Sequence, residues 1–292
     1  MGAVREDGFH PVDMIMQQLA FHDDVTVFWT PGGPRAIEIR TNRPYLPQDS
    51  RNIAWKAAEL MAEEAGIQDG TIGIILKKRI PVAAGMAGGS GNAAAVLHAL
   101  NAIWDMGLGL EELMALGARL GSDVPFCVMG QAKASPHMPE KVRQSELACC
   151  CARATGTGTE LKPLPSVSMP IVIAKPRVHV STAEVYQGFD RCTVTRRPDN
   201  DALEAVLAQA ARGAGGLQYE NFVNVLELYT LKAYPEAQAL KARMEGTAAE
   251  AVLMSGSGPT IFAVFGGMED AKAACSALRE EGYEAYWTKT IV

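Results

Sequence analysis

A run of small residues between an expected strand and an expected helix is the part of this chain best suited to bind an anion. Four glycines, at positions 85, 88, 89 and 91, follow a β-branched run and Pro81. Apolar residues then recur at helical spacing from Val96 to Trp104. The first N–H groups of a helix lack internal partners, and glycine lets a phosphate approach the backbone without a clash. The segment therefore predicts a polyphosphate site, although no Gly-Lys-Ser/Thr closes it as in a Walker loop.

The same segment also fits a weaker pattern. Gly89-Ser90-Gly91-Asn92-Ala93-Ala94 matches G-x-G-x-x-A, and Glu111 lies about 20 residues further on, as in a dinucleotide fingerprint. A second helix is expected directly after the first, so the required βαβ unit is missing. A plain turn with small residues would explain one glycine pair, but four glycines between a strand and a helix favour phosphate binding.

Asp123 is the candidate acid–base residue. It lies in Leu120-Gly121-Ser122-Asp123-Val124-Pro125, where Gly121 is a helix-ending signal and Pro125 disfavours helical backbone at the residue before it. From its position alone, Asp123 would more often be a capping or turn aspartate.

The expected elements define an α+β protein with two domains, residues 1–167 and 168–292. A hairpin is expected from residues 25–29 and 36–40 around the turn Pro31-Gly32-Gly33-Pro34, then a helix capped by Asp49 or Ser50. Residues 71–79 and 126–130 are expected strands. From about Met169 the order becomes strand, helices, two strands, helix and strand, which is a ferredoxin-like order.

Composition narrows the classes of function. The 292 residues are 48% hydrophobic and 21% charged, the balance of a globular protein, and no apolar run is long enough for a membrane span. The net charge of −6 lacks the basic footprint of a nucleic-acid-binding protein. Six cysteines, three of them consecutive at positions 149–151, fit neither a disulfide framework nor a metal site and indicate a cytoplasmic protein with reduced thiols.

The glycine-rich run resembles the ATP loop of the GHMP kinases, a family of small-molecule kinases, and Gly-x-Asp-Val-Pro resembles their catalytic-aspartate motif. The resemblance implies a two-domain fold with a mixed N-terminal sheet and a ferredoxin-like C-terminal domain. It implies ATP and Mg²⁺ as cofactors, no resident metal site, and Asp123 as the acceptor of the substrate proton. It assigns nucleotide binding to Pro81, Gly85, Met86, Ala87, Gly88, Gly89, Ser90, Gly91 and Asn92.

Further segments are similar to those of the branch that phosphorylates the 2-hydroxyl of 4-diphosphocytidyl-2-C-methyl-D-erythritol in the methylerythritol phosphate route to isoprenoids. The matching segments are Arg5 to His10, Ser181 to Tyr186 and Ser255 to Thr260. The resemblance implies a small-molecule cytidine diphosphate substrate and a monomer or homodimer, with no nucleic-acid or membrane partner. It assigns substrate binding to Phe9, His10, Thr182, Tyr186, Ser255, Gly256, Ser257 and Gly258. Cytosine would stack between Phe9 and Tyr186.

Three departures from the family pattern qualify this expectation. Gly91 stands where a second serine is usual, and residues 131–150 are expected to form an inserted, mobile loop at a hairpin tip. Family members carry a strand with A-K-[IL]-N, whose lysine assists the aspartate, and no lysine here matches it. The chain is therefore expected to begin just after that strand and to be a poor catalyst. The alternatives are a mevalonate- or homoserine-type GHMP kinase, and a catalytically impaired nucleotide-binding protein.

Overall fold

The computed structural model describes residues 10–214 and 216–292, which form two compact units. The first unit contains residues 10–18, His22–Ile80 and Ala87–Leu164. The second unit contains Leu19–Phe21, Pro81–Met86 and Pro165–Val292. The chain thus passes from one unit to the other several times, and each unit is assembled from segments that are distant in sequence.

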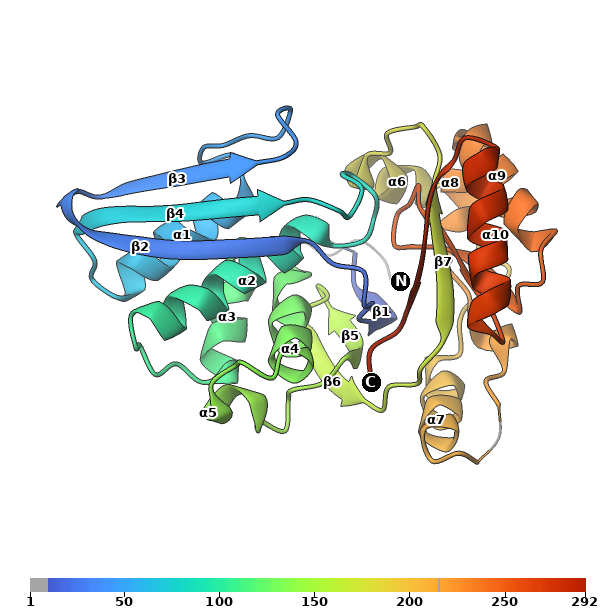
Figure 1. Ribbon diagram of the computed structural model, residues 1–292. Coiled ribbons are helices and arrows are strands. Elements are labelled where there is room, and N and C mark those ends of the chain that lie inside the picture. The colour runs from blue at the N-terminus through green and yellow to red at the C-terminus, as the bar shows by residue number, and fades with distance from the viewer. Residues whose placement is uncertain (1–9, 215) are drawn as a thin grey trace. The chain divides into compact units, whose positions relative to one another are not determined.

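The first unit contains a mixed three-stranded sheet. Its strands are β2 (Asp24–Pro34), β3 (Ala36–Thr41) and β4 (Asp69–Lys77), in the order β2-β4-β3. The expected hairpin between the first two strands is wrong, because β4 lies between them, antiparallel to β2 and parallel to β3 (Figure 1). The parallel pairing is possible because a helix connects β3 to β4, as a parallel crossover requires.

Four helices of this unit bury one face of the sheet. They are α1 (Ile53–Glu64), α2 (Gly88–Ile103), α3 (Leu110–Leu120) and α4 (Val124–Ala134). Their apolar side chains pack with Ile72, Ile74 and Leu76 of β4 in one hydrophobic core. The expected cap of α1 is wrong by a few residues, because the Asn52 side chain, not that of Asp49 or Ser50, accepts the bond from the Ala54 N–H at 3.0 Å.

The segment expected as a strand at residues 126–130 is the middle of α4. All of its residues are buried, so their polarity does not alternate, and a short apolar run of this kind does not distinguish a strand from a buried helix. Pro125 occupies the first turn of α4, where its missing N–H costs nothing. With no strand here, the expected hairpin tip is also absent from the described chain.

The segment expected as a mobile loop is folded. Residues 131–134 are the last turn of α4, and a short helix, α5 (Glu140–Arg143), follows, with Val142 only 1% exposed.

A second sheet of this unit contains three strands. β1 (Val12–Gln17) pairs with β5 (Cys151–Gly156), and β5 also pairs with β6 (Glu160–Leu164). All six thiols are free, and burial raises the pKa of Cys151 to about 12, so this run of cysteines packs the core as protonated thiols.

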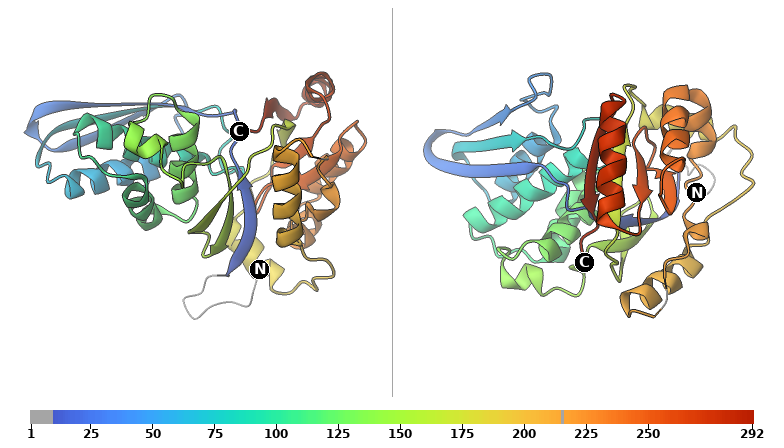
Figure 2. Two further views of the ribbon diagram at one scale, coloured as in Figure 1. Left: turned by 90° about the horizontal axis from the view of Figure 1, so that it is seen from below. Right: turned by 45° about the vertical axis from the view of Figure 1, so that its right-hand side comes forward.

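The second unit is a four-stranded antiparallel sheet of β7 (Pro170–Lys175), β8 (Ala251–Met254), β9 (Ile261–Val264) and β10 (Glu284–Lys289). The order β10-β7-β9-β8 confirms the predicted ferredoxin-like topology. The helical elements are α6 (Thr182–Phe189), α7 (Asn200–Ala211), η1 (Tyr219–Asn221), α8 (Glu227–Ala233), α9 (Pro235–Glu245) and α10 (Met268–Glu280). Figure 2 shows α10 lying along this sheet. In the described chain, no helix combines the length and apolarity needed to cross a membrane.

Candidate active site

The N-terminus of α2 presents unpaired amides. The residue before the helix, Ala87, has left-handed backbone (φ 51°, ψ 25°) and supplies no side-chain cap. The first amide with a backbone acceptor is that of Gly91, which donates to the Ala87 carbonyl at 2.8 Å. Within the described chain, no acceptor contacts the N–H groups of Gly88, Gly89 and Ser90. A strained left-handed residue followed by free helical N–H groups forms a concavity suited to an anion.

The glycines of this turn differ in the space around them. A Cβ on Gly89 would lie 3.5 Å from Ile53 Cγ2, and one on Gly91 would lie 4.0 Å from Gln131 Nε2, so both positions have room for a methyl group. A Cβ on Gly88 would lie only 3.0 Å from Ile80 Cγ2. Packing therefore explains glycine at position 88, whereas nothing in the described structure requires glycine at positions 89 and 91.

Asp123 lies between α3 and α4 and is partly buried. Burial raises the pKa of its carboxyl above the usual value, and its side chain contacts no hydrogen-bond donor or cation among the described residues. The turn that carries it lies close to α2, because Ile53 lies within 4 Å of the Cβ positions of both Gly89 and Gly121. An unneutralised carboxylate beside an anion site has the character of a proton acceptor.

The strand that follows His10 also reaches this region. A Cβ on Gly158, in the turn between β5 and β6, would lie 3.7 Å from Ser122 Cβ and 3.8 Å from Val12 Cγ2. The start of β1 and the turn before Asp123 therefore meet at one place in the first unit. Phe9, the expected stacking residue, lies outside the described residues.

Two of the substrate residues expected from the sequence are in contact in the second unit. The Thr182 and Ser257 hydroxyls lie 2.9 Å apart, and Ser257 is buried. Thr182 begins α6, and Tyr186 is one turn further along the same helix. Residues four apart share a helix face, so α6 presents Thr182 and Tyr186 together.

The turn 255–258 is held from two sides, also within the second unit. Ser255 Oγ donates to the Gly85 carbonyl at 2.8 Å, and Asn224 Nδ2 donates to the carbonyls of Met254 at 2.8 Å and Gly256 at 2.7 Å. Met86, expected to bind nucleotide, packs its side chain into the hydrophobic cluster around Met169. One direct hydrogen bond, from Ser255 to Gly85, thus joins a residue expected at the substrate to one expected at the nucleotide. Sequence reasoning missed Asn224, which no motif marks.

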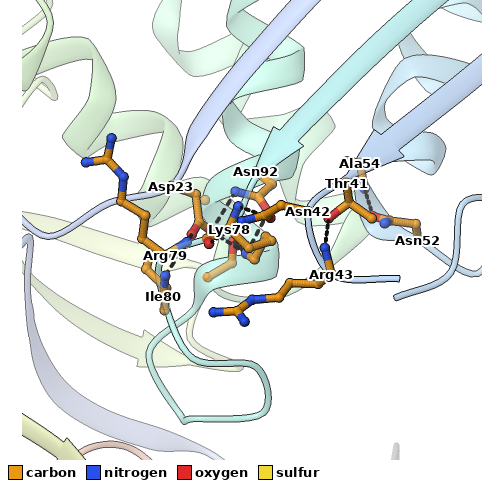
Figure 3. A network of polar contacts seen from close by, with 12 residues as sticks. Asp23, Thr41, Asn42, Arg43, Asn52, Ala54, Lys78, Arg79, Ile80 and Asn92 are labelled. Atoms are coloured by element: carbon orange, nitrogen blue, oxygen red, sulfur yellow. Dashed lines mark hydrogen bonds and ion pairs between the residues drawn. The ribbon is translucent and has the colours of Figure 1, made fainter. Parts of the chain in front are cut away.

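A buried charged network at the start of the glycine-rich turn was also missed. Lys78 Nζ contacts the carboxylate of Asp23 and donates to Asn92 Oδ1 at 2.8 Å, and all three side chains come from the first unit (Figure 3). Lys78 lies near the end of the expected strand 71–79, and its sequence neighbourhood gives no sign that it is buried. The available signal was the pair Asp23-Asp24 at the start of an expected strand.

The fold and these sites define a class of protein, and comparison with known families gives the same class. Residues 52–131 match the GHMP kinases N-terminal domain, and residues 202–284 match the GHMP kinases C-terminal domain. The chain belongs to the GHMP kinases, which confirms the resemblance and makes it a small-molecule kinase with the predicted two-domain α+β fold.

Individual relatives are more specific. The chain is 38% identical to 4-diphosphocytidyl-2-C-methyl-D-erythritol kinase of Acetivibrio thermocellus, over 98% of this chain and 93% of that protein. It is 40% identical to the protein of the same name from Exiguobacterium sibiricum, over 99% of this chain and 92% of that protein.

Solved structures agree. A crystal structure of 4-(cytidine 5'-diphospho)-2C-methyl-D-erythritol kinase superposes with a TM-score of 0.76 at 32% identity, covering 98% of this chain and 92% of that one. Homoserine kinase from Cytophaga hutchinsonii superposes with a TM-score of 0.66 at 17% identity, covering 94% of this chain and 88% of that one, and so shares the fold.

Proposed function

We propose that this protein transfers the γ-phosphoryl group of ATP to the 2-hydroxyl of 4-diphosphocytidyl-2-C-methyl-D-erythritol, a step of the methylerythritol phosphate pathway in the cytoplasm. The names of its relatives, which match nearly the whole chain, support this substrate. The observation that carries the chemistry is the set of N–H groups at the start of α2 near the partly buried carboxylate of Asp123, all without a partner among the described residues.

In this proposal the α2 N-terminus binds the ATP phosphates, and residues 81–92 supply its backbone. Left-handed backbone at Ala87 and the free amides of the first turn fit a polyphosphate. Mg²⁺ normally keeps several waters and is held by substrate phosphates with one or two protein oxygens. The described residues contain no group of three His, Cys, Asp or Glu side chains suited to a metal ion, so the phosphates would supply most of the ligands.

Asp123 would accept the proton of the attacking hydroxyl. Phosphoryl transfer depends mainly on positioning and charge neutralisation, and a carboxylate with a raised pKa is a better proton acceptor than an ordinary one. His10 would contact the polar edge of the cytosine, and Thr182, Tyr186 and residues 255–258 would bind the rest of the cytidylyl substrate.

A substrate panel tests the function. With ATP and Mg²⁺, the cytidine substrate should give one phosphomonoester product by ³¹P NMR, and its uridine equivalent should be used roughly 5- to 150-fold less well, the cost of one missed buried hydrogen bond. Turnover of mevalonate or homoserine in preference to the cytidine compound would assign the chain to another GHMP activity. ATP binding without turnover of any of these alcohols would support the nucleotide-binding alternative.

The nucleotide site can be tested by Gly89→Ala. The methyl group has space in the folded chain, and alanine favours the helix by about 0.5–1 kcal/mol, so thermal stability should be kept or increased. A phosphate approaching the same amides would meet the methyl group, and we expect the Kd for ATP, measured by calorimetry, to rise about tenfold or more. Gly246→Ala, where the nearest atom is 3.5 Å away at the end of α9, is the matched control. Unchanged ATP binding by Gly89→Ala would remove the α2 N-terminus as the phosphate site.

A further inference from the structure

The chain that leaves β4 is held by side chains where the sheet ends. β4 stops at Lys77, and the backbone of Lys78 then exchanges two bonds with one amide side chain: Asn42 Oδ1 accepts from the Lys78 N–H at 2.8 Å, and Asn42 Nδ2 donates to its carbonyl at 3.1 Å. Asp23 Oδ1 accepts the next two amides, from Arg79 at 2.7 Å and Ile80 at 2.8 Å. Residues 78–80 therefore have a fixed path although they belong to no strand.

The second oxygen of the same carboxylate holds the other end of the glycine-rich turn. Asp23 Oδ2 accepts from Asn92 Nδ2 at 3.0 Å and contacts Lys78 Nζ (Figure 3). Lys78 Nζ also donates to Asn92 Oδ1 at 2.8 Å and lies 3.5 Å from the Gly88 carbonyl. Gly88 and Asn92 belong to the first turns of α2, so the network joins the residue before the turn to the residues after it.

The network is buried and its members are satisfied. The side chain of Asp23 is 1% exposed and that of Lys78 is 6% exposed. The three ammonium hydrogens of Lys78 have three oxygen partners, in Asp23, Asn92 and Gly88. Lys78 therefore has no remaining donor for a phosphate, and its charge is neutralised by Asp23. Direct phosphate binding by this lysine does not fit the geometry.

Stability alone is also a poor explanation of this network. A buried ion pair repays its desolvation only partly, and apolar side chains of similar volume often serve as well or better. What the pair provides, and apolar groups would not, is directional bonds that fix the distance between residues 78–80 and the first turn of α2. Residues 81–87 lie between these two ends and include Ala87, whose backbone is strained. The amides without an acceptor among the described residues begin at the next residue, Gly88.

We propose that Asp23, Lys78 and Asn92 form a clasp that fixes the two ends of residues 81–87 at one separation, and that Lys78 thereby acts as a positioning residue for the nucleotide phosphates. The inference rests on the proposed nucleotide site at the α2 N-terminus. Its consequence is that a lysine with no contact to ATP determines how well ATP is bound and aligned, because misplacement by about 1 Å can cost roughly a hundredfold in rate.

The test compares Lys78→Met with Lys77→Met. Methionine keeps most of the length of lysine and removes its charge, and Lys77 is the adjacent, exposed lysine, 3.9 Å from Asp24. We expect Lys78→Met to raise the KM for ATP about 10- to 100-fold and to lower kcat, with the KM of the second substrate and the affinity for adenosine unchanged within about twofold. Lys77→Met should match the parent in every constant.

A second measurement does not depend on activity. Hydrogen exchange of peptides covering residues 78–92 should be faster in Lys78→Met than in Lys77→Met, while peptides of the second unit such as β7 stay unchanged. Should Lys78→Met fail to fold, Asp23→Asn carries the same comparison, because asparagine keeps the oxygen that accepts the amides of Arg79 and Ile80.

The outcomes separate the two proposals. If the parent binds no ATP but Lys78→Met loses exchange protection at residues 78–92, the proposed function fails together with the role of Lys78 toward ATP, and only the clasp as a structural connection stands. If the parent is active and Lys78→Met keeps both its KM for ATP and its exchange protection, the clasp inference is overturned and the function stands. A variant that loses thermal stability but keeps the KM for ATP at a temperature where it is folded also overturns the inference, because Lys78 is then only a stabilising residue.

Discussion

Asp123→Asn is expected to lower kcat by about 10²–10⁴-fold, the usual contribution of a positioned proton acceptor. Asparagine has nearly the same shape as aspartate but cannot take up the hydroxyl proton. Because the Asp123 side chain has no donor or cation among the described residues, the substitution breaks no observed side-chain bond, and the buried charge that it removes is unfavourable to the fold. Thermal stability should therefore stay the same or increase while turnover falls.

The pH dependence gives an independent check on Asp123. Its pKa is raised by burial, so the carboxylate form needed for proton acceptance is lost as the pH falls through that raised pKa. We expect kcat of the parent to fall on the acidic side with this pKa, and the acidic limb to be absent in Asp123→Asn. Asp69→Asn, at the exposed start of β4, is the control. If Asp123→Asn retains more than about a tenth of the parental kcat, another group accepts the proton.

Gly85→Ala is expected to destabilise the second unit by about 2–5 kcal/mol, without any nucleotide present. A Cβ at this position would lie 2.6 Å from the Ser255 carbonyl oxygen and 2.9 Å from that of Gly258, and both contacts are with backbone atoms. Crowding of this kind costs about 1–3 kcal/mol, and left-handed backbone (φ 67°) adds about 1–2 kcal/mol for a residue with a side chain. Urea denaturation followed by circular dichroism measures the loss.

Gly282→Ala is the control that separates the cost of crowding from the cost of left-handed backbone. Gly282 also has left-handed backbone (φ 87°) and lies in the same unit, but an added Cβ would meet nothing within 4 Å. This control should lose only the backbone cost of about 1–2 kcal/mol. Equal destabilisation by the two substitutions would mean that the turn 255–258 moves away from residue 85 without cost, and that the bond from Ser255 Oγ to the Gly85 carbonyl does not fix it.

Local signals in the sequence predicted the elements with clear periodicity. The helix after the glycine-rich turn, the ferredoxin-like order of the second unit and its last helix and strand were all predicted, because their apolar spacing or their turn residues are unambiguous. The Pro31-Gly32-Gly33-Pro34 turn was misleading. These residues end β2, with a register shift against β4 between Thr30 and Pro34, and β4 lies between β2 and β3. A turn signal thus indicates irregular backbone, but not which strand pairs with which.

The backbone part of the candidate site could be predicted from the sequence, whereas the buried side chains beside it could not. Glycine and the expected start of a helix indicated residues 85–92, and the structure adds the free amides there. The clasp could not be predicted, because the basic residues in a run such as Lys77-Lys78-Arg79 are normally exposed, whereas here Lys78 is buried. Its two partners come from separate parts of the sequence, and tertiary structure alone brings them together.

The division of each unit into distant segments has a consequence for the order in which the protein can be completed at the ribosome. Leu19–Phe21 belongs to the second unit, where the Ala20 N–H donates to the Lys289 carbonyl at 2.8 Å and Phe21 stacks on Tyr286 with ring centroids 4.5 Å apart. Translation at about 5–20 residues per second delays these partners by tens of seconds after residues 19–21 emerge. All segments of the first unit precede Pro165, so they are synthesised before that interval ends. Residues 19–21 and 81–86 belong to the second unit and remain without its complete sheet until β10 has been synthesised.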